Sequence, residues 1–143
     1  MDIEKVKYWK HPSKTNSVFV HKKNSPLIAI DMWCKAGTSF EEKEKGGIAH
    51  LLEHMIFKGS NKLLPGEFDM KIESLGGISN ASTGYDDAHY YVLTPQANFK
   101  ESLSLLANLV LNPELNPNEF KKEKSVIFEE ILESRDQPDE RLF

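Results

Sequence analysis

Residues 47–57 constrain the fold of this chain more than any other stretch, because apolar and polar residues recur there with the period of an α-helix. At about 100° per residue, a helix built from this stretch has two faces of different chemistry. The apolar face is suited to burial and carries Ile48, Leu51, Leu52, Met55 and Ile56. The opposite face carries His50, Glu53, His54 and Phe57. We therefore predict an amphipathic helix that presents two histidines away from its buried face.

His50 and His54 form a candidate metal site. Two imidazoles one helical turn apart can bind a single metal ion, and the carboxylate of Glu53 lies beside them. A single histidine is more often an ordinary core residue, but these two are paired and lie opposite the apolar face. The pattern H-x-x-E-H therefore indicates metal binding.

Composition limits the class of protein. The 143 residues are enough for one domain with a hydrophobic core, and 39% hydrophobic and 28% charged residues are typical of a soluble protein. A net charge of -4 argues against nucleic acid as a partner. The only cysteine, Cys34, excludes an intrachain disulfide. Without an apolar signal segment or a run of about 20 apolar residues, we expect a cytoplasmic protein with no membrane partner.

Strand and turn signals dominate the first two thirds of the chain. The β-rich runs 17–22 and 27–35 are predicted to pair as a hairpin, and the second, more hydrophobic run is expected to be a central strand. The charged run 41–45 is predicted to be an exposed loop. A second helix is predicted over 67–75, ended by Gly76 and Gly77. Strands are predicted over 78–83 and 88–94, for a total of about four.

Two capping patterns mark the helices near the end of the chain. Asn98-x-x-Glu101 predicts the start of a third helix. Asn116-Pro117-x-Glu119 predicts a long fourth helix that reaches about Arg135, is closed by Pro138, and is followed by a helix capped by Asp139. The predicted fold class is α+β, with a mostly antiparallel sheet packed against helices.

The long fourth helix carries a candidate third ligand. Glu123 and Glu130 lie two turns apart on nearly the same line, within an arc of apolar residues: Phe120, Val126, Ile127 and Ile131. Carboxylates within an apolar surface are costly unless a positive group compensates them, and a metal ion would do so. The alternative is that both are ordinary surface glutamates, a description that fits Glu119, Glu129 and Glu133 better.

The motif His50-x-x-Glu53-His54, followed downstream by Glu123 and Glu130, resembles the pitrilysin/insulinase family of metallopeptidases. That family carries the inverted zinc motif H-x-x-E-H and a distal glutamate ligand. The resemblance extends to residues 36–39, Gly47, residues 57–60 and residues 76–81, and so covers nearly the whole chain.

The resemblance implies a role for each candidate residue. His50, His54 and Glu130 are expected to bind Zn²⁺, Glu53 to act as the general base, and Glu123 to support the ligands from behind. Asn80 and Ala81 are expected to lie on the strand edge that binds substrate. The implied protein is a zinc metalloendopeptidase that hydrolyses extended, unstructured peptides with metal-activated water.

Family members continue well beyond the equivalent of Phe143. We therefore expect residues 1–143 to be the N-terminal part of a catalytic domain, one incomplete half that is inactive or weak alone. Its expected partners are the missing C-terminal half or a partner subunit, with a homodimer as an alternative. Two other classes stay open. A structural zinc site would need a fourth ligand, and a non-catalytic scaffold subunit of the same fold would typically have lost motif residues.

Overall fold

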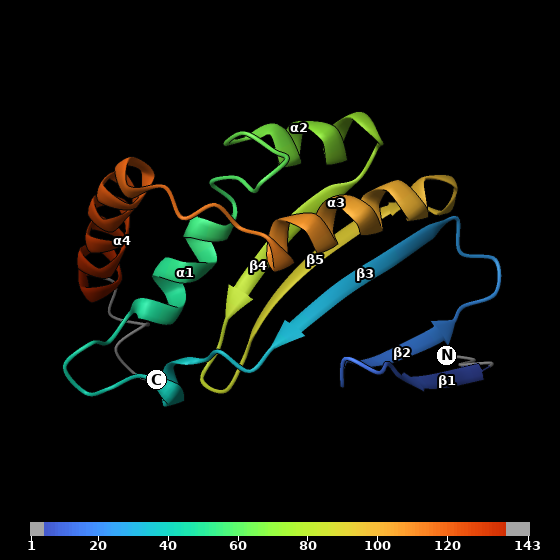
Figure 1. The fold of residues 1–143 in the computed structure, drawn as a ribbon, viewed down its shortest axis with the longest axis horizontal. Coiled ribbons are helices and arrows are strands. Elements are labelled where there is room, and N and C mark those ends of the chain that lie inside the picture. The colour runs from blue at the N-terminus through green and yellow to red at the C-terminus, as the bar shows by residue number, and fades with distance from the viewer. Residues whose placement is uncertain (1–4, 137–143) are drawn as a thin grey trace.

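The computed structural model describes residues 5–136, which form two antiparallel sheets and four α-helices (Figure 1). The elements in chain order are β1 (Lys5–Lys10), β2 (Asn16–His21), β3 (Leu27–Cys34), α1 (Ile48–Ile56), α2 (Glu67–Ser74), β4 (Ile78–Thr83), β5 (Ala88–Pro95), α3 (Phe99–Leu111) and α4 (Pro117–Asp136). Short 3₁₀ turns occupy Thr38–Phe40 and Gln96–Asn98. The predicted α+β class, with antiparallel strands packed against helices, is confirmed.

The core lies between the three-stranded sheet and helices α1, α2 and α3. The strand order is β3-β5-β4, and β5 pairs antiparallel with both neighbours. Every second residue of β5 is buried, because successive side chains of a strand point to opposite faces of the sheet. The buried apolar cluster consists of Ile30, Ile56, Leu63, Phe68, Ile72, Ala88, Tyr90, Val92, Leu106 and Leu109. This packing holds α1 beside β4 (Figure 1).

The prediction for the second hairpin is confirmed. Strand β4 pairs with β5 from Ile78↔Leu93 to Thr83↔Ala88, as the runs 78–83 and 88–94 predicted. The helix predicted over 67–75 is α2, and the chain turns at Gly76 with a positive φ of 73°. A glycine tolerates this left-handed conformation without steric cost, so it ends the helix and starts the return to β4.

The prediction for the first hairpin is wrong. Strand β2 pairs with β1, which the sequence analysis missed, and β3 pairs with β5. Among the described strands, β3 therefore lies at an edge of its sheet rather than at the centre, and there are five strands instead of about four. The reason lies in the tertiary packing. Alternate residues of β5 are buried beneath the helices, so β5 takes the central place in the sheet and pairs on both sides.

A cavity of ≈920 Å³ separates the β1–β2 ribbon from β3. Consecutive residues of both strands line it, from 17 to 22 and from 27 to 31. Since side chains of a strand alternate between faces, an unbroken run of lining residues means that the cavity follows the strand edges. At those edges β2 and β3 each lack a neighbour among the described strands.

Helix α1 forms where it is predicted, but its apolar face is only partly covered. Met55 and Ile56 are buried, whereas Ile48 is 51% exposed and Leu52 is 36% exposed. The expectation that the whole face is buried is therefore wrong for the described residues. Ala49 in the first turn is buried as well, so the exposed strip from Ile48 to Leu52 consists of these two apolar side chains.

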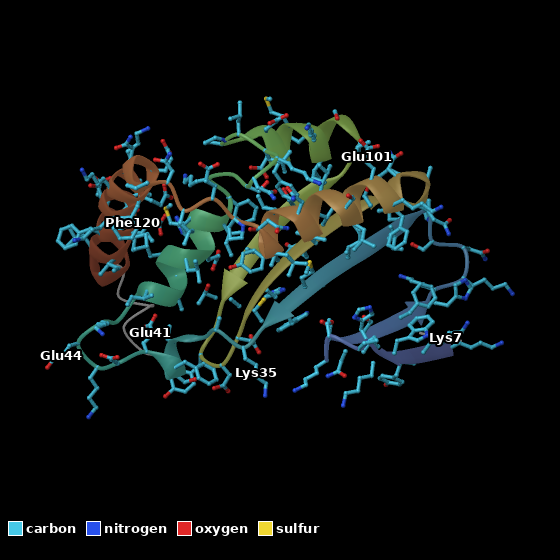
Figure 2. The ribbon with its side chains drawn as sticks, in the orientation of Figure 1. Lys7, Lys35, Glu41, Glu44, Glu101 and Phe120 are labelled. Carbon is cyan, nitrogen blue, oxygen red and sulfur yellow. The ribbon has the colours of Figure 1, made fainter. Side chains whose placement is uncertain are left out.

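Glu41 departs from the prediction that residues 41–45 form an exposed loop. Its Oε2 accepts a hydrogen bond from Gly47 N at 2.8 Å, and its Oε1 accepts one from Ala49 N at 2.6 Å. A carboxylate at this position satisfies free N–H groups and interacts favourably with the positive end of the helix dipole. Glu44, in the same loop, points to solvent, while Glu41 lies beside the start of α1 (Figure 2). Glu41 thus anchors the helix that carries both histidines.

The two predicted capping patterns have different outcomes. Asn116 Oδ1 accepts hydrogen bonds from Asn118 N at 2.8 Å and Glu119 N at 3.4 Å, so this asparagine caps α4 as predicted. Asn98 does not cap α3; its Nδ2 donates to Leu75 O at 2.8 Å, so the helix is predicted correctly but its cap is not.

The fourth helix runs to Asp136, close to its predicted end. Pro138 and Asp139 lie outside the described residues.

Candidate metal centre

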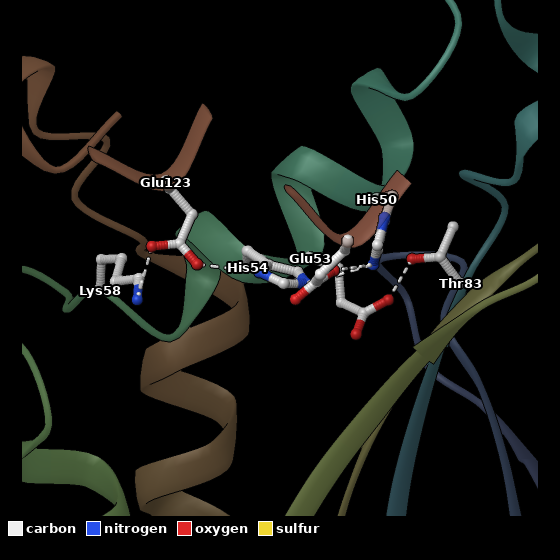
Figure 3. A network of polar contacts seen from close by, with 7 residues as sticks. His50, Glu53, His54, Lys58, Thr83 and Glu123 are labelled. Carbon is white, nitrogen blue, oxygen red and sulfur yellow. Dashed lines mark hydrogen bonds and ion pairs between the residues drawn. The ribbon is translucent and has the colours of Figure 1, made fainter. Parts of the chain in front are cut away.

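His50 and His54 occupy successive turns of α1 and face α4 (Figure 3). Their Nε2 atoms are 3.1 Å apart, and their rings are nearly perpendicular, at 88°. The i, i+4 spacing of an α-helix places both side chains on one face, as the sequence predicted. Two imidazole nitrogens at this separation can bind the same ion.

Glu130 of α4 completes a group of three. Its Oε2 lies 3.8 Å from His50 Nε2 and 3.7 Å from His54 Nε2. The three ligand atoms lie within 4.8 Å of one another. The structure thus brings together the residues that the sequence analysis named, because α4 packs against α1.

The geometry and chemistry of this group fit a zinc ion. Tetrahedral ligands about 2.1 Å from a metal lie about 3.4 Å from one another. The three observed separations, 3.1, 3.7 and 3.8 Å, lie on both sides of that value. Two imidazoles and one carboxylate are also a ligand set used by catalytic zinc sites, which keep a fourth position open. The His50 and Glu130 side chains are 38% and 43% exposed, so solvent can reach that position.

Glu123 orients the His54 ring by contacting Nδ1, the ring nitrogen that faces away from His50 and Glu130. Glu123 Oε1 lies 2.8 Å from His54 Nδ1, and Lys58 Nζ lies 2.7 Å from the other oxygen, Oε2. With Nδ1 donating to a carboxylate, a neutral His54 carries its lone pair on Nε2, the atom that faces His50 and Glu130. The ring is therefore held in the form that binds metal.

Glu123 is a buried carboxylate, only 6% exposed. Burial by itself raises the pKa of this carboxyl, but the hydrogen bonds from Lys58 and His54 outweigh it, so the pKa is lowered from its ordinary value. An unpaired buried charged oxygen would cost about 1–3 kcal/mol or more. Lys58 therefore matters to the site, although the sequence analysis gave it no role. Its position four residues after His54 is the signal that could have identified it.

Glu53 lies on the side of α1 that faces β4. Thr83 Oγ1 donates a hydrogen bond to Glu53 Oε2, which ties the end of β4 to the helix (Figure 3). Glu53 is outside the group of three potential ligands and so can accept a proton while they bind metal. Thr83 was missed by the sequence analysis. Alternation along β4 places it on the same face as Ala81, and that alternation is the only sequence signal for its role.

Asn80 and Ala81 line an open cavity of ≈250 Å³ next to His54. The other lining residues are Glu53, His54, Phe57, Lys58, Ser79 and Glu123. Strand β4 is an edge strand of its sheet within the described part of the chain. Ala81 N donates to Asn80 Oδ1 at 2.8 Å. The chain thus has an accessible strand edge at one wall of the candidate site.

A family model described as insulinase (Peptidase family M16) matches residues 17–143. The chain belongs to this family. The resemblance drawn from the H-x-x-E-H motif and its surroundings is therefore confirmed.

Three relatives show what this member of the insulinase family is similar to. The zinc protease PqqE of Helicobacter pylori is 42% identical over 104 residues, which are 73% of this chain and 23% of that protein. A probable mitochondrial-processing peptidase subunit beta of Arabidopsis thaliana is 35% identical over 82% of this chain and 22% of its own length. The crystal structure of a protease from Helicobacter pylori superimposes with a TM-score of 0.86 and 36% identity, covering 90% of this chain and 31% of that one.

The chain thus spans between 22% and 31% of the length of these three proteins. The fold of the described residues is that of insulinase-family structures. None of the described helices is both long enough and apolar enough to cross a membrane.

Proposed function

We propose that this chain is the zinc-binding part of a metalloendopeptidase. The convergence of His50, His54 and Glu130 carries the proposal, because it provides three zinc ligands on an open site. Glu53 lies beside these residues without belonging to the group, and β4, an edge strand among those described, borders them. A general base and a surface for an extended peptide therefore adjoin the same metal position.

In the proposed reaction, the chain's residues bind the metal, hold the peptide and move protons. A zinc ion held by the two imidazoles and Glu130 supplies a Lewis acid for water and for the peptide carbonyl. Glu53 accepts the proton of the attacking water and later returns it to the leaving amine. Thr83 keeps the Glu53 carboxylate directed into the site by its hydrogen bond to Oε2.

The proposed substrate is an extended, unstructured peptide that adds to β4 as a further strand. Backbone hydrogen bonds to a sheet edge supply affinity with little demand on sequence. Ala81 N is presently hydrogen-bonded to Asn80 Oδ1, and a peptide carbonyl could replace that acceptor. The cavity of ≈250 Å³ next to β4 offers room for a substrate side chain. Such binding favours unstructured peptides over folded proteins.

We further propose that residues 1–143 act as the N-terminal part of a catalytic domain that needs additional polypeptide. The relatives are several times longer than the matched region, and one of them is named a subunit. The cavity between β2 and β3 and the exposed strip from Ile48 to Leu52 are surfaces that such polypeptide could cover. A C-terminal half, a partner subunit or a second copy could supply it. Alone, the chain leaves water around the reacting carbonyl, so we expect weak activity.

The alternative function is that of a non-catalytic scaffold subunit. Two measurements distinguish it from the proposed peptidase. Metal analysis of the purified chain is expected to give one zinc per chain, lost on replacement of both histidines by alanine. A quenched unstructured peptide is then assayed with the chain alone and within a full-length protein that contains it. Zinc-dependent cleavage by the full-length protein supports a peptidase. Absence of cleavage by the full-length protein, with or without bound zinc, supports the scaffold. Absence of zinc binding contradicts the proposed peptidase.

A further inference from the structure

Lys58 shares one carboxylate with His54. The two residues are four apart, at the C-terminal end of α1, and Glu123 of α4 lies between them (Figure 3). Lys58 Nζ is 2.7 Å from Glu123 Oε2, and His54 Nδ1 is 2.8 Å from Glu123 Oε1. Each oxygen of Glu123 thus has its own partner, His54 on α1 and Lys58 in the turn that follows α1.

We propose that Lys58 is a positioning residue of the metal centre, acting through Glu123 on both His54 and Glu130. The inference rests on the proposed zinc site, since it explains how the ligands are held ready for the ion. It concerns a side chain that neither binds the metal nor takes part in proton transfer.

The first part of the argument concerns the His54 ring. Glu123 can orient the ring only if its carboxylate is held in one rotation, with Oε1 toward Nδ1. The bond from Lys58 to Oε2 restrains that rotation from the opposite side. A carboxylate oxygen held in this place accepts a hydrogen bond from Nδ1 and so selects the ring tautomer with its proton on Nδ1. Nε2 is then left free for the metal.

The second part concerns the placement of α4. Among the described elements, α1 is the one against which α4 makes its main contacts. Among the described side chains of α4, only Glu123 and Ile127 are buried, so Glu123 is one of the few points that fix the rotation of this helix. The contacts of Glu123 with Lys58 and His54 fix the position of α4 at this residue. Glu130 lies two turns further along nearly the same line, and this places its carboxylate at the two Nε2 atoms.

The test compares three variants of the chain. Lys58→Met removes the charge and the donor but keeps the length of the side chain, and Lys58→Arg keeps a charged donor. The matched control is Lys122→Met, which breaks a lysine–glutamate pair of the same 2.7 Å length, Lys122 with Glu119, on the exposed surface of α4. Folding of each variant is followed by circular dichroism.

Two readouts separate positioning from general stability. Zinc affinity is measured by competition with a chromogenic chelator, and the tautomer of His54 is read from ¹⁵N shifts of the metal-free chain. We expect Lys58→Met to bind zinc about tenfold or more weakly and to lose the uniform Nδ1–H tautomer. Lys58→Arg should restore most of both properties, and Lys122→Met should match the wild type. If Lys58→Met does not fold, Lys58→Gln takes its place and should give intermediate values.

A double variant tests whether Lys58 acts through Glu123. If it does, Lys58→Met should change zinc affinity little in a chain that already carries Glu123→Gln. A folded Lys58→Met chain with wild-type zinc affinity and tautomer overturns the inference while leaving the proposed function intact. Equal losses in the presence and absence of Glu123 also overturn it. A wild-type chain that binds no zinc defeats the proposed function itself, and the metal-free tautomer measurement still reports on Lys58.

Discussion

Thr83 and Glu53 are joined by a hydrogen bond between the end of β4 and the middle of α1, with Thr83 Oγ1 as the donor and Glu53 Oε2 as the acceptor. The strand edge proposed to bind substrate is thereby linked to the carboxylate proposed to act as base. This contact keeps one carboxylate oxygen engaged and leaves the other free to accept a proton. Substitution of Glu53 is therefore expected to abolish peptide cleavage, whereas substitution of Thr83 is expected only to reduce it.

Glu53→Gln, made in a full-length protein that cleaves peptides, should retain zinc and lose nearly all activity. Glutamine has almost the shape of glutamate and can still accept the Thr83 hydrogen bond, but it cannot serve as a general base at neutral pH. Zinc content by metal analysis and turnover of a quenched peptide test the prediction. Cleavage at close to the wild-type rate would show that another group takes the proton.

Thr83→Val in the same protein should lower kcat by about tenfold, because the Glu53 carboxylate loses the donor that directs it. Valine matches threonine in shape and in preference for β-structure, so β4 should persist. Ser82→Val, on the opposite face of β4, is the control and should have a much smaller effect. Equal losses in the two variants would point to strand damage instead of a misdirected base.

Glu130→Gln should weaken zinc binding much more than Glu123→Gln. Glu130 is the proposed ligand, whereas Glu123 contacts Lys58 and the Nδ1 side of the His54 ring, away from the proposed metal position. Substitutions of residues that orient a ligand in this way typically cost about 10- to 100-fold in metal affinity. Competition with a chelator measures both values on the isolated chain. The assignment of ligand and supporting residue would be wrong if the two variants lost zinc equally.

Glu67 should contribute to stability in a pH-dependent way. Its pKa is lowered, first by the hydrogen bond from Lys71 and then by that from Leu64 N, so the folded state favours the ionised form. The contribution is therefore present above the ordinary carboxyl pKa and is lost as pH falls through the lowered value. Glu67→Gln should reduce Tm at neutral pH, and the difference from wild type should shrink in acid. A difference independent of pH would contradict this account.

The sequence alone determined those parts of the site that depend on one helix at a time. The spacing of His50 and His54 is a local property of α1, and the common line of Glu123 and Glu130 is a local property of α4. Asn116 caps α4 because its side chain reaches backbone N–H groups two and three residues ahead. The family resemblance then supplied the pairing of the two helices, which no local pattern contains.

The tertiary structure alone decided which distant groups meet. The pairing of β2 with β1 and of β3 with β5 depends on competition for the buried place beside β5, which a reading of each strand in isolation cannot weigh. The contacts of Glu41 with Gly47 and of Thr83 with Glu53 likewise exist only after loops have closed and α1 has packed beside β4. Helical periodicity is set by covalent geometry and can be read from the sequence. Contacts across the chain are set by the packing of the whole fold.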